Sequence, residues 1–121
     1  MMDKLIKEVS ELVEAEYGRA AAKFGCANNS DHESYAVLQE ELDEALDEVG
    51  VVEDAMAYFW GQVKRNSPDQ EKIKICDKLE KCALLAACEF IQVAAMAKKA
   101  AITVAGRNVI VIPTEMAGDR E

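Results

Sequence analysis

Two short pairs of polar residues are the strongest candidates for chemistry in this sequence. Glu41 and Glu44 form the first pair, and Glu89 and Gln92 form the second. Each member directly precedes an apolar position of a long helical pattern, so both pairs should border the packing face of their helix. If the two helices run antiparallel about a turn between residues 66 and 67, Glu41 faces Gln92. The same symmetry brings Glu44 to Glu89, about 34 Å from the turn.

Three carboxylates and one amide that meet at one point suggest a metal site. Ionised carboxylates repel one another unless a cation neutralises them, and ligand sets made only of oxygen favour Mg²⁺ or Mn²⁺. We therefore predict a divalent metal site whose ligands are Glu41, Glu44, Glu89 and Gln92. The alternative is a solvated acidic face, because the chain has 23 acidic residues and isolated Glu-x-x-Glu pairs are common on helix surfaces.

The surroundings of Glu89 strengthen the first interpretation. The run from Leu84 to Ala97 is nearly apolar on all sides, which predicts a helix buried from several directions, and Glu89 is its only acid. Burial of a carboxylate without a partner costs free energy, so a ligand or a hydrogen-bond partner is expected there. The cations that follow near the helix end are Lys98, Lys99 and Arg107. They are candidates for contact with phosphate groups, but the favoured interpretation is that they are solvated or compensate the helix dipole.

Two long helices over residues 35–104 should position these groups. Apolar residues recur at spacings of three and four on each arm, and the breaker between the arms is the stretch 66–69 with Pro68. The expected packing positions of the first arm are Tyr35, Leu38, Leu42, Ala45, Val49, Val52, Met56, Phe59 and Val63. Those of the second arm are Cys76, Leu79, Ala83, Ala86, Phe90, Val93, Ala97, Ala100 and Val104. The sequence therefore predicts a long antiparallel helical hairpin.

Shorter segments flank this hairpin. A first helix should run from Asp3 to about Phe24, and the residues from Gly25 to Asn29 should break it. Ser30 or Asp31 should cap the next helix, with Ser30-x-x-Glu33 as a capping box. The last helix should stop at Gly106, and residues 108–113 are expected to lie extended before a polar end.

Composition favours one all-α domain. The chain has 121 residues, 50% of them hydrophobic, with two prolines and six glycines, which fits a helical bundle at residues 1–105 and a C-terminal tail at 106–121. Two or three long helices leave apolar surface uncovered, so we expect a homodimer or homotetramer to complete the bundle. The aromatic cluster of Tyr58, Phe59 and Trp60 is expected in the core or in a subunit contact, with the core favoured.

Charge and cysteine usage exclude several classes of protein. A net charge of −9 leaves no basic stripe for nucleic acid. No apolar run is long enough for a signal core or a membrane span, so we expect a cytoplasmic protein that contacts neither nucleic acid nor membrane. The four cysteines have no metal-binding spacing and are expected as buried, reduced thiols. His32, the only histidine, is expected at the surface or in a cap.

The segments that carry the two polar pairs resemble a known enzyme family. Residues 35–45, YAVLQEELDEA, and residues 87–97, ACEFIQVAAMA, are similar to the MazG-like all-α nucleoside triphosphate pyrophosphohydrolases, including small phage and prophage members. That family carries Glu-x-x-Glu on one helix and Glu-x-x-Asp on a later one, which together bind Mg²⁺. Glu41, Glu44 and Glu89 match these motifs, whereas Gln92 stands in place of the aspartate.

The resemblance implies a MazG-like bundle that uses Mg²⁺ to hydrolyse a nucleoside triphosphate to the monophosphate and pyrophosphate. The residues that would serve catalysis and metal binding are Glu41, Glu44, Glu89 and Gln92. Helical spacing favours Glu48 as the catalytic base, ahead of Glu40 and Asp43. The alternative is a catalytically degenerate helical oligomer that acts as a phage or prophage interaction or structural protein, which Gln92 favours.

Overall fold

The chain folds into helices throughout the part that the structure describes. A computed structural model describes residues 2–107, in which the helices are α1 (Met2–Phe24), α2 (Asp31–Arg65) and α3 (Asp69–Arg107). The prediction of an all-α protein is therefore confirmed for these residues. The extended stretch expected at 108–113 and the polar end after it lie outside the described residues.

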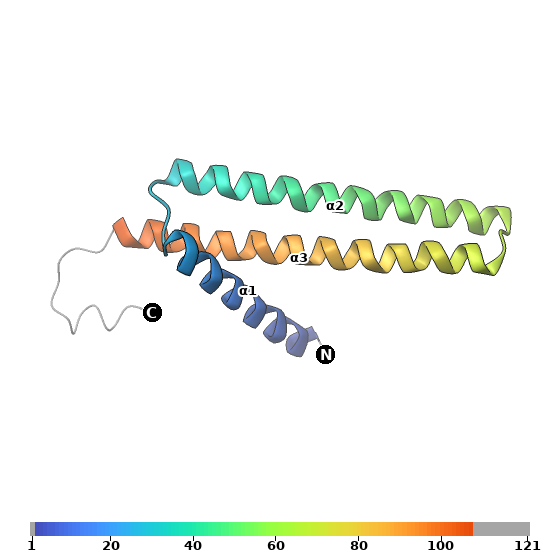
Figure 1. The fold of residues 1–121 in the computed structure, drawn as a ribbon, viewed down its shortest axis with the longest axis horizontal. Helices are drawn as coiled ribbons and strands as arrows, with labels where there is room; N and C mark the ends of the chain where they lie inside the picture. The colour runs from blue at the N-terminus through green and yellow to red at the C-terminus, as the bar shows by residue number, and fades with distance from the viewer. Residues whose placement is uncertain (1, 108–121) are drawn as a thin grey trace.

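Helices α2 and α3 lie side by side along their whole lengths and run in opposite directions (Figure 1). The turn between them begins at Asn66, whose left-handed backbone (φ 55°) ends α2. The N–H of Asn66 donates to the Val63 carbonyl at 3.1 Å, and the N–H of Ser67 donates to the Gln62 carbonyl at 3.0 Å. These bonds satisfy the last carbonyls of α2, and Pro68 then precedes α3 at a position where no backbone N–H is needed.

At several positions of α2 and α3, the residue that is buried between the two helices is the one directly before the residue that the pattern predicts. On α2, Ala55 is buried and Met56 is 52% exposed. On α3, Cys82 is buried where the pattern predicts Ala83. The same shift makes Ser34, Gln62, Ile75 and Thr103 the buried residues and Tyr35, Val63, Cys76 and Val104 the exposed ones. The apolar stripe is wider than the contact between two helices, and several of the short side chains turn inward, which lets the helix axes approach closely.

This shift corrects three expectations about burial. Trp60 is 58% exposed, so the aromatic cluster does not form a core within this chain. Leu84 is 64% exposed and Leu85 is 55% exposed, so the run from 84 to 97 is not buried from several directions. Of the four free cysteines only Cys82 is buried. Toward the turn end of the hairpin, α2 and α3 have only each other as neighbours among the described residues, and one neighbour covers one side of a helix.

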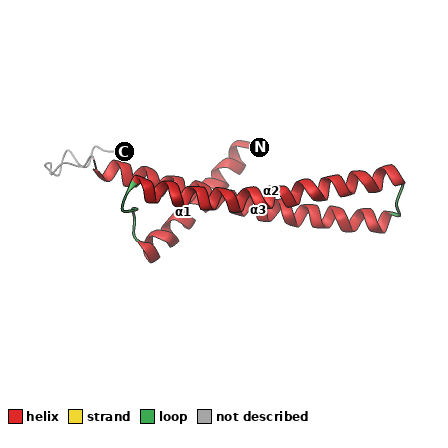
Figure 2. Cartoon of the chain, turned by 90° about the horizontal axis from the view of Figure 1, so that it is seen from above, coloured by secondary structure: helices red, strands yellow, loops and turns green. Residues whose placement is uncertain are grey.

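Helix α1 crosses α3 obliquely near the end of the hairpin that is remote from the turn (Figures 1 and 2). Lys98 of α3 pairs with Glu14 at 2.8 Å, and the Tyr17 hydroxyl donates to the Cys26 carbonyl at 2.8 Å. Gly25, with φ 96°, ends α1 in a backbone conformation that other residues rarely adopt. No side chain of α1 is fully buried, so this helix packs against α3 along one side only and does not close a bundle.

Ser30 caps α2, and its neighbour Glu33 supports the same helix start. The Ser30 hydroxyl accepts the N–H of Glu33 at 3.1 Å, as the predicted capping box requires. The Glu33 carboxylate accepts the backbone N–H of Asn29 at 3.2 Å instead of that of Ser30. The carboxylate half of the capping box is therefore shifted by one residue toward the N-terminus. The two bonds together hold the backbone at the start of α2.

We expect Ser30→Ala to lower the free energy of unfolding by about 1 kcal/mol, because the Glu33 N–H then loses its acceptor. Chemical denaturation followed by circular dichroism measures this difference. Ser10→Ala, in the exposed interior of α1, is the matched control and should change stability by less than about 0.5 kcal/mol. Equal losses in the two variants would contradict a capping role for Ser30.

Candidate functional site

Three carboxylates converge between α2 and α3. One carboxylate oxygen from each of Glu41, Glu44 and Glu89 can be chosen so that all three lie within 4.8 Å of one another. Glu41 and Glu89 are half-buried and Glu44 is exposed, so one side of the cluster faces solvent. We call these three residues the acidic cluster. The structure therefore brings together three of the four predicted ligands.

The one-residue shift in the packing face explains why these acids meet. Glu89 lies on the side of α3 that faces α2, while its neighbour Phe90 is 42% exposed. Ala45 is fully buried one residue after Glu44 and Ala86 is buried one turn before Glu89, so the two helices approach closely beside the cluster. The acids therefore lie at the edge of the contact between the helices, with Glu44 on the side that faces solvent.

The pKa of the Glu41 carboxyl is raised by its position in the acidic cluster. Burial raises the pKa of its carboxyl first, and the neighbouring charges of Glu44 and Glu89 raise it further. Smaller contributions come from Glu40 and Glu16. Burial and the neighbouring carboxylates all raise the pKa of Glu41, so its ionisation is disfavoured until a cation approaches.

Glu16 of α1 is a fourth carboxylate at this site, and sequence reasoning missed it. Hydrogen bonds from Arg19 and then Gln92 hold the pKa of Glu16 below its ordinary value, so this carboxylate stays ionised. Its charge also reaches Glu41, as the pKa of Glu41 shows. No periodic signal marks Glu16 in the sequence, because its position depends on the angle at which α1 crosses α3.

Gln92 and Glu48 occupy different places relative to the acidic cluster. The Gln92 side chain lies near Glu16, whose pKa it helps to lower, and lines the cavity beside Glu41. An amide in this position can donate to Glu16, which an ionised aspartate would repel. Glu48 follows Glu44 by one turn, is half-buried, and is not one of the three acids that meet. Its role as a base stays a prediction.

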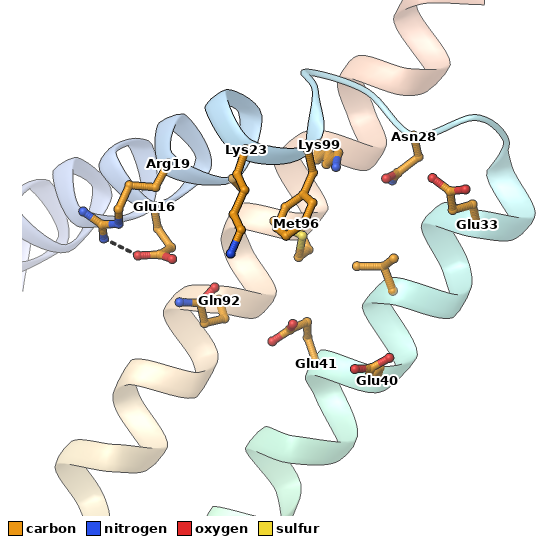
Figure 3. Close-up of a pocket in the computed structure, with 13 residues that line it drawn as sticks. Glu16, Arg19, Lys23, Asn28, Glu33, Glu40, Glu41, Gln92, Met96 and Lys99 are labelled. Carbon is orange, nitrogen blue, oxygen red and sulfur yellow. Dashed lines mark hydrogen bonds and ion pairs between the residues drawn. The ribbon is translucent and has the colours of Figure 1, made fainter.

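A cavity of about 720 Å³ adjoins the acidic cluster and is bounded by all three helices (Figure 3). Glu41 and Gln92 lie at one end of it, and Asn28 and Lys99 lie near the connection between α1 and α2. The Lys23 side chain extends from α1 toward Gln92 (Figure 3). Apolar contact is available from Phe24, Val37 and Met96. The cavity therefore combines cations, acids and apolar side chains, as a site for a charged organic ligand requires.

Lys99 corrects the interpretation of the cations near the end of α3. Its residue surface is only 7% exposed, whereas a solvated cation would extend into water. Lys98 contacts the exposed Glu14 carboxylate and lies 5.8 Å from the centre of the Tyr17 ring. Neighbouring lysines thus have different surroundings, because successive residues of a helix point about 100° apart.

In comparisons with known proteins, no family model, no curated protein and no solved structure matches the chain. What the fold and the site define is an all-helical protein with an acidic cluster beside a ligand-sized cavity. Among residues 2–107, no helix combines the length and the apolar character that crossing a bilayer requires.

The raised pKa of Glu41 predicts how stability depends on pH. Because the folded-state pKa lies above that of the unfolded chain, the stabilising contribution of protonated Glu41 is complete below the unfolded pKa and is lost as pH rises through the folded pKa. With divalent cations removed by EDTA, Glu41→Gln should therefore raise the melting temperature at about pH 7 and leave it nearly unchanged at about pH 4. Thermal denaturation at the two pH values measures both differences.

Asp47→Asn is the matched control for this prediction, because Asp47 is an exposed acid on the same helix and the substitution removes the same charge. Its effect on the melting temperature should be small at both pH values. A Glu41→Gln variant that is no more stable than the natural chain at pH 7 would mean that the cluster does not repel itself.

Proposed function

We propose that this protein hydrolyses a nucleoside triphosphate to the monophosphate and pyrophosphate with the help of Mg²⁺, as MazG-like pyrophosphohydrolases do. The observation that carries the proposal is the convergence of Glu41, Glu44 and Glu89 beside the cavity. The resemblance of residues 35–45 and 87–97 to that family supports it independently, because it rests on sequence motifs rather than on geometry.

The donor set of the acidic cluster fits a hard divalent cation. All three donors are carboxylate oxygens, they approach within 4.8 Å of one another, and Glu44 leaves the cluster open to solvent for water or substrate ligands. Bound there, Mg²⁺ would neutralise phosphate charge and lower the pKa of a coordinated water; Mn²⁺ is the alternative ion. The mutual repulsion that raises the pKa of Glu41 would then become attraction to the cation.

The residues of the chain would divide the remaining work. Glu41, Glu44 and Glu89 would hold the cation, which would position the reacting phosphate groups. A further carboxylate must take the proton of the attacking water. Sequence spacing favours Glu48 for this role, but Glu40 lines the cavity and Glu48 does not, which favours Glu40. Gln92 and Arg19 hold Glu16 at the edge of the site.

The test is pyrophosphate release from the canonical ribo- and deoxyribonucleoside triphosphates and dUTP, with Mg²⁺ and then Mn²⁺. Release by the natural chain that disappears in Glu44→Ala would support the proposal and begin to identify the substrate. Glu53→Ala, which removes an exposed acid farther along the same helix, is the matched control. If a folded chain released pyrophosphate from none of the nucleotides with either metal, the enzymatic proposal would be wrong.

A second candidate function is a non-enzymatic helical oligomer that acts as an interaction or structural protein. The observation in its favour is the exposed apolar surface of the hairpin away from α1, which includes Tyr58, Trp60, Leu84 and Leu85. Gln92 in place of an acid agrees with a site that lost its activity. A homodimer or homotetramer that covers this surface is compatible with either function, and sedimentation equilibrium would measure the number of subunits.

A further inference from the structure

Lys99 is a buried cation without a partner. Only 7% of its residue surface is exposed, and its ammonium group forms no hydrogen bond or ion pair within residues 2–107. The chain connecting α1 to α2 helps to bury it. The Asn28 N–H donates to the Thr103 hydroxyl at 2.8 Å, and that hydroxyl donates to the Lys99 carbonyl at 2.8 Å. Within the described residues the unpartnered polar side-chain atom that is closed off from solvent is Oε1 of Gln62, so the Lys99 ammonium keeps access to the cavity, where an anion can pair with it.

Lys23 is a second cation of the same cavity that lacks a carboxylate partner. In the described part of the chain it forms no ion pair, and its ammonium lies 5.1 Å from the centre of the adjacent Phe24 ring. Figure 3 shows its side chain extending between α1 and Gln92. Arg19 differs, because Glu16 already pairs with it. Two positive charges of the cavity are therefore available to a ligand.

We infer that Lys99 and Lys23 form an anion subsite for the phosphate groups that extend from the acidic cluster toward the α1–α2 connection. The inference deepens the proposed function and rests on it for the identity of the ligand. Lysine ammonium groups bind phosphate as point charges, and a cavity of about 720 Å³ has room for a nucleotide. The acidic cluster alone would repel the same phosphates. The carboxylates would therefore bind the cation, and the two lysines would bind the phosphate groups.

The spacing along α3 assigns a direction to the bound nucleotide. Lys99 follows Glu89 by ten residues, about 15 Å of helical rise. Both side chains tilt toward the N-terminus of α3, and the longer lysine side chain reaches farther in that direction, which shortens the gap between the two charged ends. One triphosphate can therefore contact both regions in different places. With the bond between the α- and β-phosphates at the acidic cluster, the β- and γ-phosphates, which leave as pyrophosphate, lie toward Lys99.

The test uses inorganic pyrophosphate as the probe and calorimetric titration of the full chain in EDTA, which removes any contribution of metal. Lys99→Met should weaken pyrophosphate binding about tenfold or more, and Lys23→Met should weaken it by a smaller factor, because Lys23 is exposed. Lys98→Met is the matched control, since it removes the same charge from the next residue, which pairs with Glu14 outside the cavity. We expect that control to change the affinity less than about twofold.

The outcomes separate this inference from the proposed function. Equal pyrophosphate affinity in the natural chain and Lys99→Met, or equal weakening by Lys98→Met, would overturn the subsite even if the chain hydrolyses nucleotides. Tenfold weakening confined to the cavity lysines would support the anion subsite even if no nucleotide is hydrolysed. Circular dichroism of each variant checks the fold, and Lys23→Met provides a second variant at an exposed position if Lys99→Met is unstable.

Discussion

Glu89→Gln should lower the rate of pyrophosphate release by about 10² to 10³-fold. The substitution keeps the shape and the hydrogen-bonding capacity of the side chain but removes one of three charges that meet within 4.8 Å. Loss of several kcal/mol of transition-state charge stabilisation corresponds to a factor of this size, at about 1.4 kcal/mol for each factor of ten. Initial rates at saturating nucleotide and metal measure the effect.

Glu80→Gln is the matched control for this prediction, because Glu80 is an exposed acid of α3 that lies toward the turn end of the hairpin. It should leave the rate within about twofold of that of the natural chain. If Glu89→Gln retained full activity while remaining folded, Glu89 would be removed from the catalytic proposal. The stability of Glu89→Gln without metal should equal or exceed that of the natural chain, because the substitution relieves repulsion with Glu41.

Saturating Mg²⁺ should raise the melting temperature of the natural chain by about 10 °C. A ligand that binds only the folded state at a hundred times its Kd adds about 2.7 kcal/mol, and each kcal/mol raises the melting temperature of a domain of this size by about 4 °C. Glu44→Ala should lose most of this shift, because it removes one of the three carboxylate donors that meet. Differential scanning fluorimetry at several Mg²⁺ concentrations gives the apparent affinity of each variant.

The same titration tests the contribution of Glu16. Its carboxylate is held ionised by Arg19 and Gln92, and its charge reaches Glu41, so Glu16→Gln should weaken Mg²⁺ binding about tenfold without abolishing it. Glu11→Gln removes an exposed acid from the same helix and serves as the control. Identical affinities in Glu16→Gln and the natural chain would show that α1 contributes nothing to the metal site.

The position of Gln92 near Glu16 affects how many negative charges lie around the acidic cluster. In the family that the chain resembles, an acid occupies the corresponding position, and the sequence alone suggests a weakened site. In this structure Gln92 lines the same cavity as the Glu16 carboxylate of α1 and contributes to the lowered pKa of Glu16. An ionised acid that lies far from both motifs in sequence is therefore near the position where the motif lacks one.

The sequence by itself determined the helices and most of the acidic cluster. Long apolar periodicity, the breaker around Pro68 and the cap at Ser30 act locally, so they predicted the start of α2 and the turn between α2 and α3 that the structure has. The predicted end at Gly106 was wrong, because α3 continues through that residue to Arg107. The expected meeting of Glu41 and Glu44 with Glu89 followed from the symmetry of two helices about one turn. That symmetry needs only the position of the turn and the rise of a helix.

Only the tertiary structure decided which side of each helix turns inward and what α1 adds to the site. Periodicity cannot distinguish two overlapping apolar stripes, and close approach of the helix axes selected the one that buries Ala55 and Cys82. The crossing angle of α1 on α3 brings Glu16 to Gln92, and the connection after α1 buries Lys99. These contacts join residues far apart in sequence, and they depend on how whole helices pack rather than on any local pattern.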